Sequence, residues 1–260
     1  MRGAAGDLQP SGFRGTTSFA GSRFEGGVSF QKARFGDLVT FDHAHLSWAR
    51  FDGSRFEKNT RFHSTEFPTD AAFDRTRFAG QATFVGATFS RVDFTDTEFG
   101  GATFFRAATF SGMTVFAGAR FADSAVFDDA RFHALASLAM MVFADSAVFS
   151  DVEFLDTATF RGTDFQGKAL FGGSVFHRRT DFTHAMFGRS ANFAGVRFVD
   201  GVDVFPARAR LDVREEDVNR VWPEKWRLLE PEPPENGKIL NREGIWGTVF
   251  DTTKFGSGEQ

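Results

Sequence analysis

Residues 116–127 read FAGARFADSAVF, and the spacing of their three phenylalanines decides the fold. These phenylalanines are five and then six residues apart, and the same alternation continues in both directions along the chain. The repeating unit is therefore eleven residues long. It defines 36 consecutive positions from Phe13 to Val204, called slots here, and 33 of them hold Phe. The exceptions are Leu46, Leu138 and Val204.

The alternation is one residue short at two places, 46–51 and 89–94, if Phe105 is taken as a slot residue. Phe104 stands directly before Phe105. Neighbouring residues of a strand face opposite ways, so one ring of this pair must point outward. The sequence leaves open which of the two lies in the core.

A small side chain stands two residues before almost every slot. It is Ala, Ser, Thr or Val in 35 of the 36 cases, and only Met141 departs from the rule. An offset of two places both side chains on one face of an extended strand. Gly and Asp are frequent between these strands, as at Gly53, Gly80 and Asp123, which is typical of turns. Each unit therefore predicts a short strand with two inward side chains, followed by a corner.

A helix does not explain this period. At about 100° per residue, slots five apart would lie about 140° apart around the axis, wider than one buried stripe. A β-solenoid with four strands per coil needs 22 residues per coil, and the segment FADSAVF occurs at 121–127 and again at 143–149. The slots then give nine coils and, at about 4.8 Å per coil, a rod roughly 43 Å long.

These features resemble the pentapeptide-repeat proteins, whose units hold a central Phe or Leu with a small residue two positions before it. The resemblance covers 13–204 and is nearest to the Phe-rich bacterial branch with alternating five- and six-residue spacing. It implies an all-β fold, a right-handed quadrilateral β-solenoid of about nine coils. It implies no particular activity, because one fold hosts many functions. We divide the chain into an N-terminal segment (1–12), the solenoid (13–204) and a C-terminal cap (205–260).

The C-terminal segment has a different composition, with five of the seven Pro and three of the four Trp after Phe205. Asp212 and Glu215 have the spacing of a helix N-cap and its N3 partner. An apolar stripe formed by Val218, Val221 and Trp222 follows them. This pattern predicts a helix over 213–221, so that a helix-containing cap covers the last coil.

Two strands, Trp226–Glu230 and Trp246–Phe250, are expected around the loop PEPPENG. The apolar residues of this tail either plug the last coil or form a dimer contact. They are Val218, Val221, Trp222, Trp226 and Trp246. C-terminal elements dimerise some gyrase-binding pentapeptide-repeat proteins, so the resemblance keeps a homodimer open.

The sequence contains no catalytic constellation. It has no Cys, which excludes thiolate nucleophiles and Cys-based zinc sites. His43 and His45 would both face outward, but no third ligand accompanies them, so we predict no metal site. A core filled with Phe leaves no internal pocket. We therefore predict a non-enzymatic protein that uses no cofactor.

Composition predicts a soluble protein. The chain holds 30 basic and 34 acidic side chains, a balance that argues against nonspecific binding to nucleic acid. No run of 18 apolar residues and no hydrophobic signal segment occurs, so we expect no membrane span and a cytoplasmic location. The excess of Arg over Lys and the abundance of Ala and Gly suggest a bacterial source.

Charged side chains suggest two further surfaces. Placing the slots on four faces stacks Arg34, Arg55, Arg77 and Arg120 in one outward column that Glu98 interrupts. Such a column could bind an anionic partner, but solvated Arg side chains covering the backbone explain it as well. A second surface is an acidic band within 111–160, a segment that contains seven acidic residues and only two basic ones. The seven are Asp123, Asp128, Asp129, Asp145, Asp151, Glu153 and Asp156.

Gyrase-binding relatives in the family are described as mimicking a DNA duplex with an acidic rod. The resemblance therefore suggests a DNA-mimicking protein that binds DNA gyrase or another topoisomerase as an alternative function. Residues 13–110 argue against a long acidic stripe, because they hold 12 basic and 11 acidic side chains.

One face of the predicted solenoid is apolar. Its outward residues, at offsets of 21 or 22, are Thr83, Phe104, Val126, Val148 and Leu170, with Val85 beside Thr83. A flat apolar strand surface often marks a contact site, although β-branched residues suit strands without any partner. Our preferred function is therefore a rigid scaffold that binds a protein, whose identity the sequence does not specify.

Overall fold

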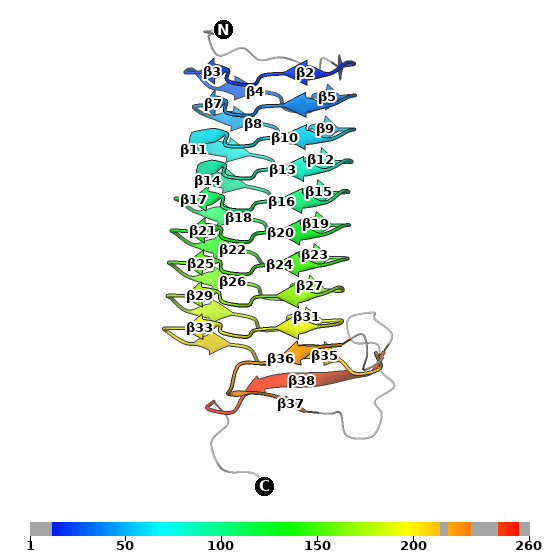
Figure 1. The fold of residues 1–260 in the computed structure, drawn as a ribbon, viewed down its shortest axis with the longest axis vertical. Coiled ribbons are helices and arrows are strands. Elements are labelled where there is room, and N and C mark those ends of the chain that lie inside the picture. The colour runs from blue at the N-terminus through cyan, green and yellow to red at the C-terminus, as the bar shows by residue number, and fades with distance from the viewer. Residues whose placement is uncertain (1–11, 214–217, 230–243, 255–260) are drawn as a thin grey trace.

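The computed structural model describes residues 12–213, 218–229 and 244–254. They form a straight rod of stacked coils with a small antiparallel sheet at the C-terminal end (Figure 1). All regular elements among these residues are β-strands, which confirms the predicted all-β solenoid.

Each coil contributes one strand to each of four walls, and strands of successive coils pair in parallel. Wall 1 contains β1 (Gly12–Phe13), β5 (Arg34–Phe35), β9 (Arg55–Phe56), β12 (Arg77–Phe78), β15 (Glu98–Phe99), β19 (Arg120–Phe121), β23 (Val142–Phe143), β27 (Asp164–Phe165) and β31 (Met186–Phe187). Wall 2 contains β2 (Thr17–Ser18), β6 (Val39–Thr40), β10 (Thr60–Arg61), β13 (Ala82–Thr83), β16 (Thr103–Phe104), β20 (Ala125–Val126), β24 (Ala147–Val148), β28 (Ala169–Leu170) and β32 (Ala191–Asn192).

Walls 3 and 4 are joined into one sheet by two longer strands, β11 (Glu66–Ala72) and β14 (Thr88–Asp93). The other strands of wall 3 are β3 (Arg23–Phe24), β7 (His45–Leu46), β17 (Thr109–Phe110), β21 (Arg131–Phe132), β25 (Glu153–Phe154), β29 (Val175–Phe176) and β33 (Arg197–Phe198). The other strands of wall 4 are β4 (Val28–Ser29), β8 (Ala49–Arg50), β18 (Thr114–Val115), β22 (Ala136–Ser137), β26 (Ala158–Thr159), β30 (Thr180–Asp181) and β34 (Val202–Asp203). Coils are numbered from the N-terminus, so that coil 6 holds slots Phe121 to Leu138.

The slot side chains fill the interior of the rod. Of the 36 slots, 32 are buried and the remaining four are half-buried near the two ends. Rings of one wall stack face to face, as Phe41 and Phe62 do with centroids 4.8 Å apart. Rings of the opposite walls 2 and 4 meet edge to face across the core, as Phe51 and Phe62 do at 83°. Both are favourable aromatic geometries, so each ring contacts neighbours in its own coil and in the coils beside it.

The structure places Phe105, not Phe104, in the core. Phe105 is fully buried and stacks on Phe84 and Phe127 at centroid distances of 4.8 and 4.9 Å. Phe104 points outward and is half-buried. The choice of Phe105 as the slot residue, and with it the two short spacings, is confirmed.

The corners after walls 2 and 4 are tight turns. Their second residue has a positive φ, for example 65° at Gly53, 59° at Asp129 and 54° at Asp151. The slot carbonyl at such a corner accepts a hydrogen bond from the third following amide, as Phe127 O does from Ala130 N at 3.0 Å. Positive φ favours Gly, Asn and Asp, which explains part of the Gly and Asp content of the corners.

The two short spacings lie in the corner between walls 3 and 4. There β11 and β14 run across the corner, and their pairing shifts register between Phe67 and Asp70. The shift occurs because the wall 3 and wall 4 slots are six positions apart in coil 3, at Phe67 and Phe73, but five positions apart in coils 2 and 4. An open groove of about 550 Å³, lined by Trp48 and Arg91 among others, lies beside this irregularity.

The cap contains strands, and the prediction of a helix over 213–221 is wrong for the part that is described. β35 (Ala207–Arg210) continues wall 1, and β36 (Arg220–Val221) pairs with β32 as the next strand of wall 2. The open edge of the last coil thus pairs with a segment whose own pattern favours a helix. Asp212 binds Arg210 through its carboxylate at 2.8 Å, and Glu215 lies outside the described residues.

The two predicted tail strands are confirmed. They are β37 (Trp226–Leu229) and β38 (Trp246–Asp251), which pair antiparallel, and β38 also pairs antiparallel with β35. This closing sheet covers the end of wall 1. The loop PEPPENG lies outside the described residues.

Candidate protein-binding surface

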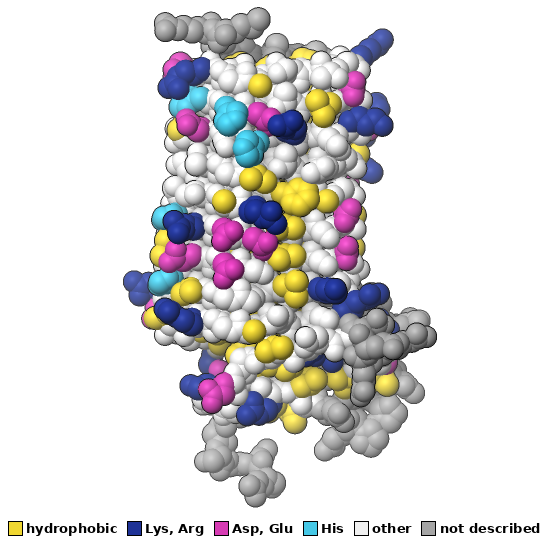
Figure 2. Space-filling model, in the orientation of Figure 1, with side chains coloured by type: hydrophobic (Ala, Val, Ile, Leu, Met, Phe, Trp, Pro, Cys, Tyr) yellow, Lys and Arg dark blue, Asp and Glu magenta, His cyan; other side chains and the backbone are white. Residues whose placement is uncertain are grey.

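The predicted apolar residues form one continuous column on wall 2. Thr83, Phe104, Val126, Val148 and Leu170 are successive partners in the parallel ladder from β13 to β28. We call these five residues the wall 2 stripe. Each is half-buried, and Figure 2 shows a column of hydrophobic side chains along the middle of this face. Val85 lies at the corner after slot Phe84, next to the start of the stripe.

Backbone hydrogen bonds hold the wall 2 stripe rigidly. The carbonyls of Val126, Val148 and Leu170 each accept a hydrogen bond from the slot amide of the preceding coil. The distances are 2.7, 2.7 and 2.6 Å from the amides of Phe105, Phe127 and Phe149. Because the slot rings are also stacked in the core, the backbone that carries the outward side chains is held in place before any partner binds.

The other walls carry charge at the same levels. In coils 4 to 8, the outward residues of wall 1 are Arg77, Glu98, Arg120, Val142 and Asp164. Those of wall 3 are Thr88, Thr109, Arg131, Glu153 and Val175. Those of wall 4 are Asp93, Val115, Ser137, Thr159 and Asp181. Only wall 2 has five uncharged, mainly apolar positions in a row at these levels.

The structure distributes the acidic band over four places around the rod. Asp123 and Asp145 lie on the corner between walls 1 and 2, and Asp128, Asp129 and Asp151 lie on the corner between walls 2 and 3. These five carboxylates therefore stand on both sides of the wall 2 stripe in coils 6 and 7. Figure 2 shows acidic side chains to the left and to the right of the hydrophobic column. Glu153 lies on wall 3, and Asp156 lies on the corner between walls 3 and 4.

The carboxylates beside the stripe are largely uncompensated. Asp128 lies 3.6 Å from Arg106, a weak exposed pair. Among the described residues, Asp123, Asp129, Asp145 and Asp151 form no ion pair with a basic side chain. Glu153, away from the stripe, is paired with Arg131 at 3.6 Å and His177 at 3.1 Å. The face of wall 2 thus combines an apolar centre with negative margins.

The predicted arginine column is present on wall 1. Arg34, Arg55, Arg77, Glu98 and Arg120 are successive partners in the ladder. Arg34 lies 3.0 Å from Glu57 and Arg77 lies 3.6 Å from Glu98, so acidic neighbours offset part of the positive charge. These exposed pairs favour the simpler reading, in which the column is a solvated surface.

Two carboxyl groups meet in the corner between walls 4 and 1, next to the arginine column. Burial raises the pKa of Asp52, and its hydrogen bond with Asp74 acts in the same direction. The pKa of Asp74 is lowered, first by that hydrogen bond and then by Arg75. The two carboxyls therefore share a proton more readily than separate ones would. Together with Arg50 and Thr69 they line the open groove beside the register shift of β11 and β14.

The histidines singled out in the sequence do not converge. His43 sits at a corner with its ring against His63, at a centroid distance of 5.5 Å. His45 begins β7, and its Nδ1 lies 2.8 Å from Glu66 Oε2. Within the part of the chain that the structure describes, no three His, Asp or Glu side chains are grouped as metal ligands would be.

The tryptophans of the tail close the end of the core. Trp222 stacks on Phe193, with ring centroids 5.9 Å apart and 27° between the planes. Trp226 is buried over Phe182, Phe193 and Phe198. Trp246 is buried, Val218 is half-buried, and Val221 is exposed on β36. These contacts show that the tail plugs the end of the core within one molecule. The dimer contact stays a prediction, and of the five residues named for it only Val221 is exposed.

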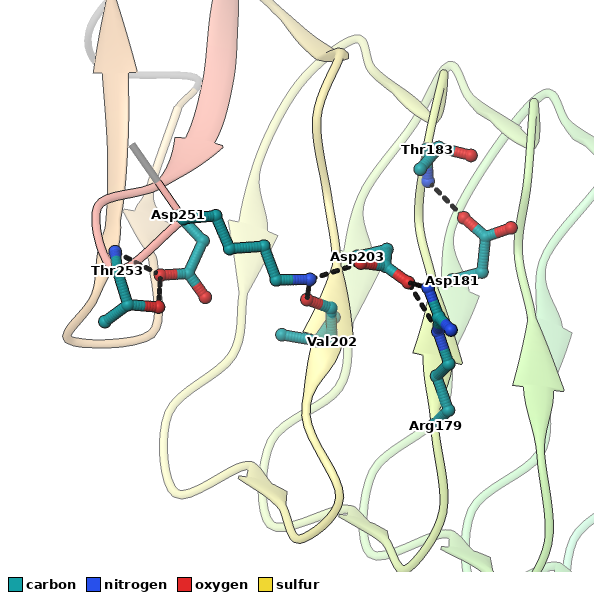
Figure 3. Close-up of polar contacts among 8 residues, drawn as sticks. Arg179, Asp181, Thr183, Val202, Asp203, Asp251 and Thr253 are labelled. Carbon is teal, nitrogen blue, oxygen red and sulfur yellow. Dashed lines mark hydrogen bonds and ion pairs between the residues drawn. The ribbon is translucent and has the colours of Figure 1, made fainter. Parts of the chain in front are cut away.

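An ionic clamp that the sequence pattern did not indicate joins the cap to the last coil. Arg179, from coil 8, donates from Nε to Asp203 at 2.7 Å (Figure 3). Lys254, which follows β38, donates to the same carboxylate and, at 2.6 Å, to the carbonyl of Val202. Both cations lower the pKa of Asp203, Lys254 most strongly. Asp251 turns the chain after β38 by accepting from Thr253 (Figure 3).

The described residues contain no helix that is long and apolar enough to cross a membrane.

Comparison with known protein families agrees with this architecture. No curated protein matches the chain. A family described as pentapeptide repeats (9 copies) matches residues 13–55, 41–88, 51–98, 94–139 and 140–186. These matches cover most of the solenoid and more than half of the chain. The protein is therefore a member of the pentapeptide-repeat family.

Proposed function

We propose that this protein is a non-enzymatic scaffold that holds a protein partner against wall 2. The observation that carries the proposal is the wall 2 stripe, which presents Thr83, Phe104, Val126, Val148 and Leu170 on five successive coils. The centres of protein interfaces are depleted in charged residues and enriched in apolar and aromatic ones. Wall 2 has this composition, and the other walls at the same levels do not.

Rigidity supports the same function. Association costs free energy when side chains and loops must be ordered at the interface. Here the stripe lies on paired strands whose slot rings are stacked, so little ordering remains to be done. The five rungs span four coil steps, about 19 Å at about 4.8 Å per coil.

The proposal is tested by comparing two triple variants with the wild type. In Val126→Thr/Val148→Thr/Leu170→Thr the stripe becomes polar while every slot is kept. In the control Val115→Thr/Val142→Thr/Val175→Thr, three half-buried outward valines are changed on walls 4, 1 and 3. Each tagged protein is used to recover partners from extracts of its native host, with the recovered proteins quantified.

We expect a partner that the wild type and the control recover and the stripe variant loses. Recovery of the same partners by all three proteins would contradict a binding role for the stripe. Light scattering on the same proteins identifies self-association, because a second copy on wall 2 would lower the mass of the stripe variant alone.

A DNA-mimicking, gyrase-binding role is the second candidate. The five carboxylates beside wall 2 in coils 6 and 7 favour it. The valines between them and the mixed charge of the earlier coils weaken it. A gyrase supercoiling assay separates the two functions: inhibition of gyrase, or its protection from a drug, at micromolar protein would favour the DNA mimic.

A further inference from the structure

We infer that the partner of wall 2 is a cationic amphipathic α-helix, with an apolar ridge on the stripe and Lys or Arg on both flanks. This inference rests on the proposed function and names the chemistry of the partner. It is carried by one juxtaposition, an apolar column bordered on both sides by carboxylates. In coil 6 Val126 lies between Asp123 and Asp128–Asp129, and in coil 7 Val148 lies between Asp145 and Asp151.

Charge complementarity determines the sign of the charge on the two flanks of the partner helix. Five carboxylates border Val126 and Val148, whereas the basic residues of the same margins are Arg106 at one end and Lys168 at the other. Of these, Arg106 is already paired with Asp128. Unlike charges across an interface increase the association rate and like charges exclude wrong partners. A partner with acidic flanks would therefore be rejected at coils 6 and 7.

The same charges argue against a second copy of this chain. In a two-fold arrangement centred on Val126, the carboxylates of coil 6 face those of coil 6 in the second molecule when the rods are antiparallel, and the carboxylates of coils 6 and 7 face each other when the rods are parallel. Like-charge contacts of this kind are costly at an interface. A basic segment of another protein has a charge complementary to this surface, whereas a second copy of the chain does not.

The dimensions of wall 2 fit a helix that lies along the rod. The stripe spans about 19 Å, which corresponds to about 13 residues at a helical rise of 1.5 Å per residue. An apolar ridge on a helix recurs at intervals of three and four residues, about 4.5 to 6 Å along its axis at 1.5 Å per residue. That interval is close to the coil spacing of about 4.8 Å, so ridge side chains can settle between successive rungs.

Two double variants with the same charge change test the contribution of the margins. Asp123→Asn/Asp151→Asn removes one carboxylate from each side of the stripe. Asp156→Asn/Asp96→Asn is its control, placed on the two corners that border wall 4. Asp123 and Asp156 both cap the next amide at 2.6 Å, and Asp151 and Asp96 both have φ of 54°. Both Asp151 and Asp96 also pack against a glycine of the following coil.

The probes are three helix-stapled, fluorescent peptides of about 14 residues. The basic peptide has a Leu ridge and Lys flanks, the acidic peptide has the same ridge with Glu flanks, and the polar peptide has Lys flanks with a Ser ridge. Binding to the intact protein is measured by fluorescence anisotropy at low and at physiological salt. We expect the basic peptide to bind at least 10-fold more tightly than the other two.

The Asp123→Asn/Asp151→Asn variant should weaken binding of the basic peptide roughly 2- to 30-fold, as expected for two exposed charge contacts. The Asp156→Asn/Asp96→Asn control should bind like the wild type. Equal weakening in both variants, or equal binding of the basic and acidic peptides, would overturn the inference. If the acidic peptide binds and Val126→Thr/Val148→Thr/Leu170→Thr abolishes that binding, the helix chemistry is wrong and the proposed binding face stands. If the stripe variant leaves both peptide binding and partner recovery unchanged, both proposals fail.

Discussion

The indole of Trp226 lies nearly parallel to the ring of Phe198, with centroids 5.9 Å apart and 18° between the planes. Trp226 thereby continues the aromatic stack of wall 3 beyond the last coil. We expect Trp226→Ala to lower the free energy of unfolding by about 3 to 5 kcal/mol, because a large buried side chain is removed. Urea unfolding followed by circular dichroism measures this loss. A stability equal to that of the wild type would show that the cap does not protect the core.

The clamp on Asp203 should make the docking of the cap depend on pH. Lys254 and Arg179 lower the pKa of Asp203, so its contribution to stability is present above the ordinary Asp pKa near 3.8 and is lost as pH falls through the lowered value. Asp203→Asn should cost about 1 kcal/mol at pH 7, and this difference from the wild type should disappear below the lowered pKa.

Tryptophan fluorescence during urea unfolding reports this effect, because three of the four Trp lie in the cap. The control is Asp200→Asn, which removes a pair with Arg178 at 3.1 Å that does not involve the cap. A constant difference between Asp203→Asn and the wild type from pH 7 to pH 3 would contradict the clamp.

Phe104 and Phe105 are adjacent and should respond differently to the same substitution. Phe105→Ala opens a cavity between Phe84 and Phe127, and we expect a loss of about 3 to 5 kcal/mol. Phe104→Ala removes a half-buried outward ring and should cost less than about 1 kcal/mol. Equal losses in chemical denaturation would mean that the assigned register of coil 5 is wrong.

Gly27 is needed for two reasons, its φ of 78° and the indole of Trp48, which occupies the space that a Cβ would take. Gly53→Ala is the matched control, because φ there is 65° and the nearest foreign atom, Cγ of Lys32, is 3.6 Å from the added Cβ. We expect Gly53→Ala to cost about 1 kcal/mol from backbone strain, and Gly27→Ala to cost about 1 to 3 kcal/mol more.

Combining Gly27→Ala with Trp48→Ala should recover the part of the loss that is due to the clash. Thermal unfolding of the wild type, Gly27→Ala, Trp48→Ala and the double variant gives this coupling energy. Strictly additive losses would show that Trp48 does not press on this corner.

The sequence was sufficient to predict the solenoid because the residues that form its core, the slot phenylalanines, recur with the period of the fold. The spacing allowed Phe105 as the slot residue without excluding Phe104, and the stacking of Phe105 between Phe84 and Phe127 decides between them. The cap was harder, because its local pattern and its final structure conflict. Val218, Val221 and Trp222 have helical spacing, but Arg220–Val221 pairs with the free edge of β32. That edge is a property of the folded solenoid and cannot be seen in the segment itself.

The candidate surface was predicted in separate parts. The stripe followed from stacking outward residues, whereas the acidic residues were counted along a window of sequence that crosses three corners and wall 3. Assigning each acid to its corner was the missing step. The signal was present: Asp123 and Asp145 are 22 residues apart, and so are Asp129 and Asp151. The ionic clamp at Asp203 had no such signal, because Lys254 reaches it from a part of the chain 51 residues away.

Site-specific photo-crosslinking tests the central claim, a protein-binding face on wall 2, most directly. A benzophenone amino acid replaces Val148 on wall 2 in one protein and Val175 on wall 3 in another, since both valines are half-buried and point outward. After irradiation in cells of the native host, we predict an adduct with a second protein from position 148 and none from position 175. Adducts of equal yield from both positions, or no adduct from position 148, would contradict the claim.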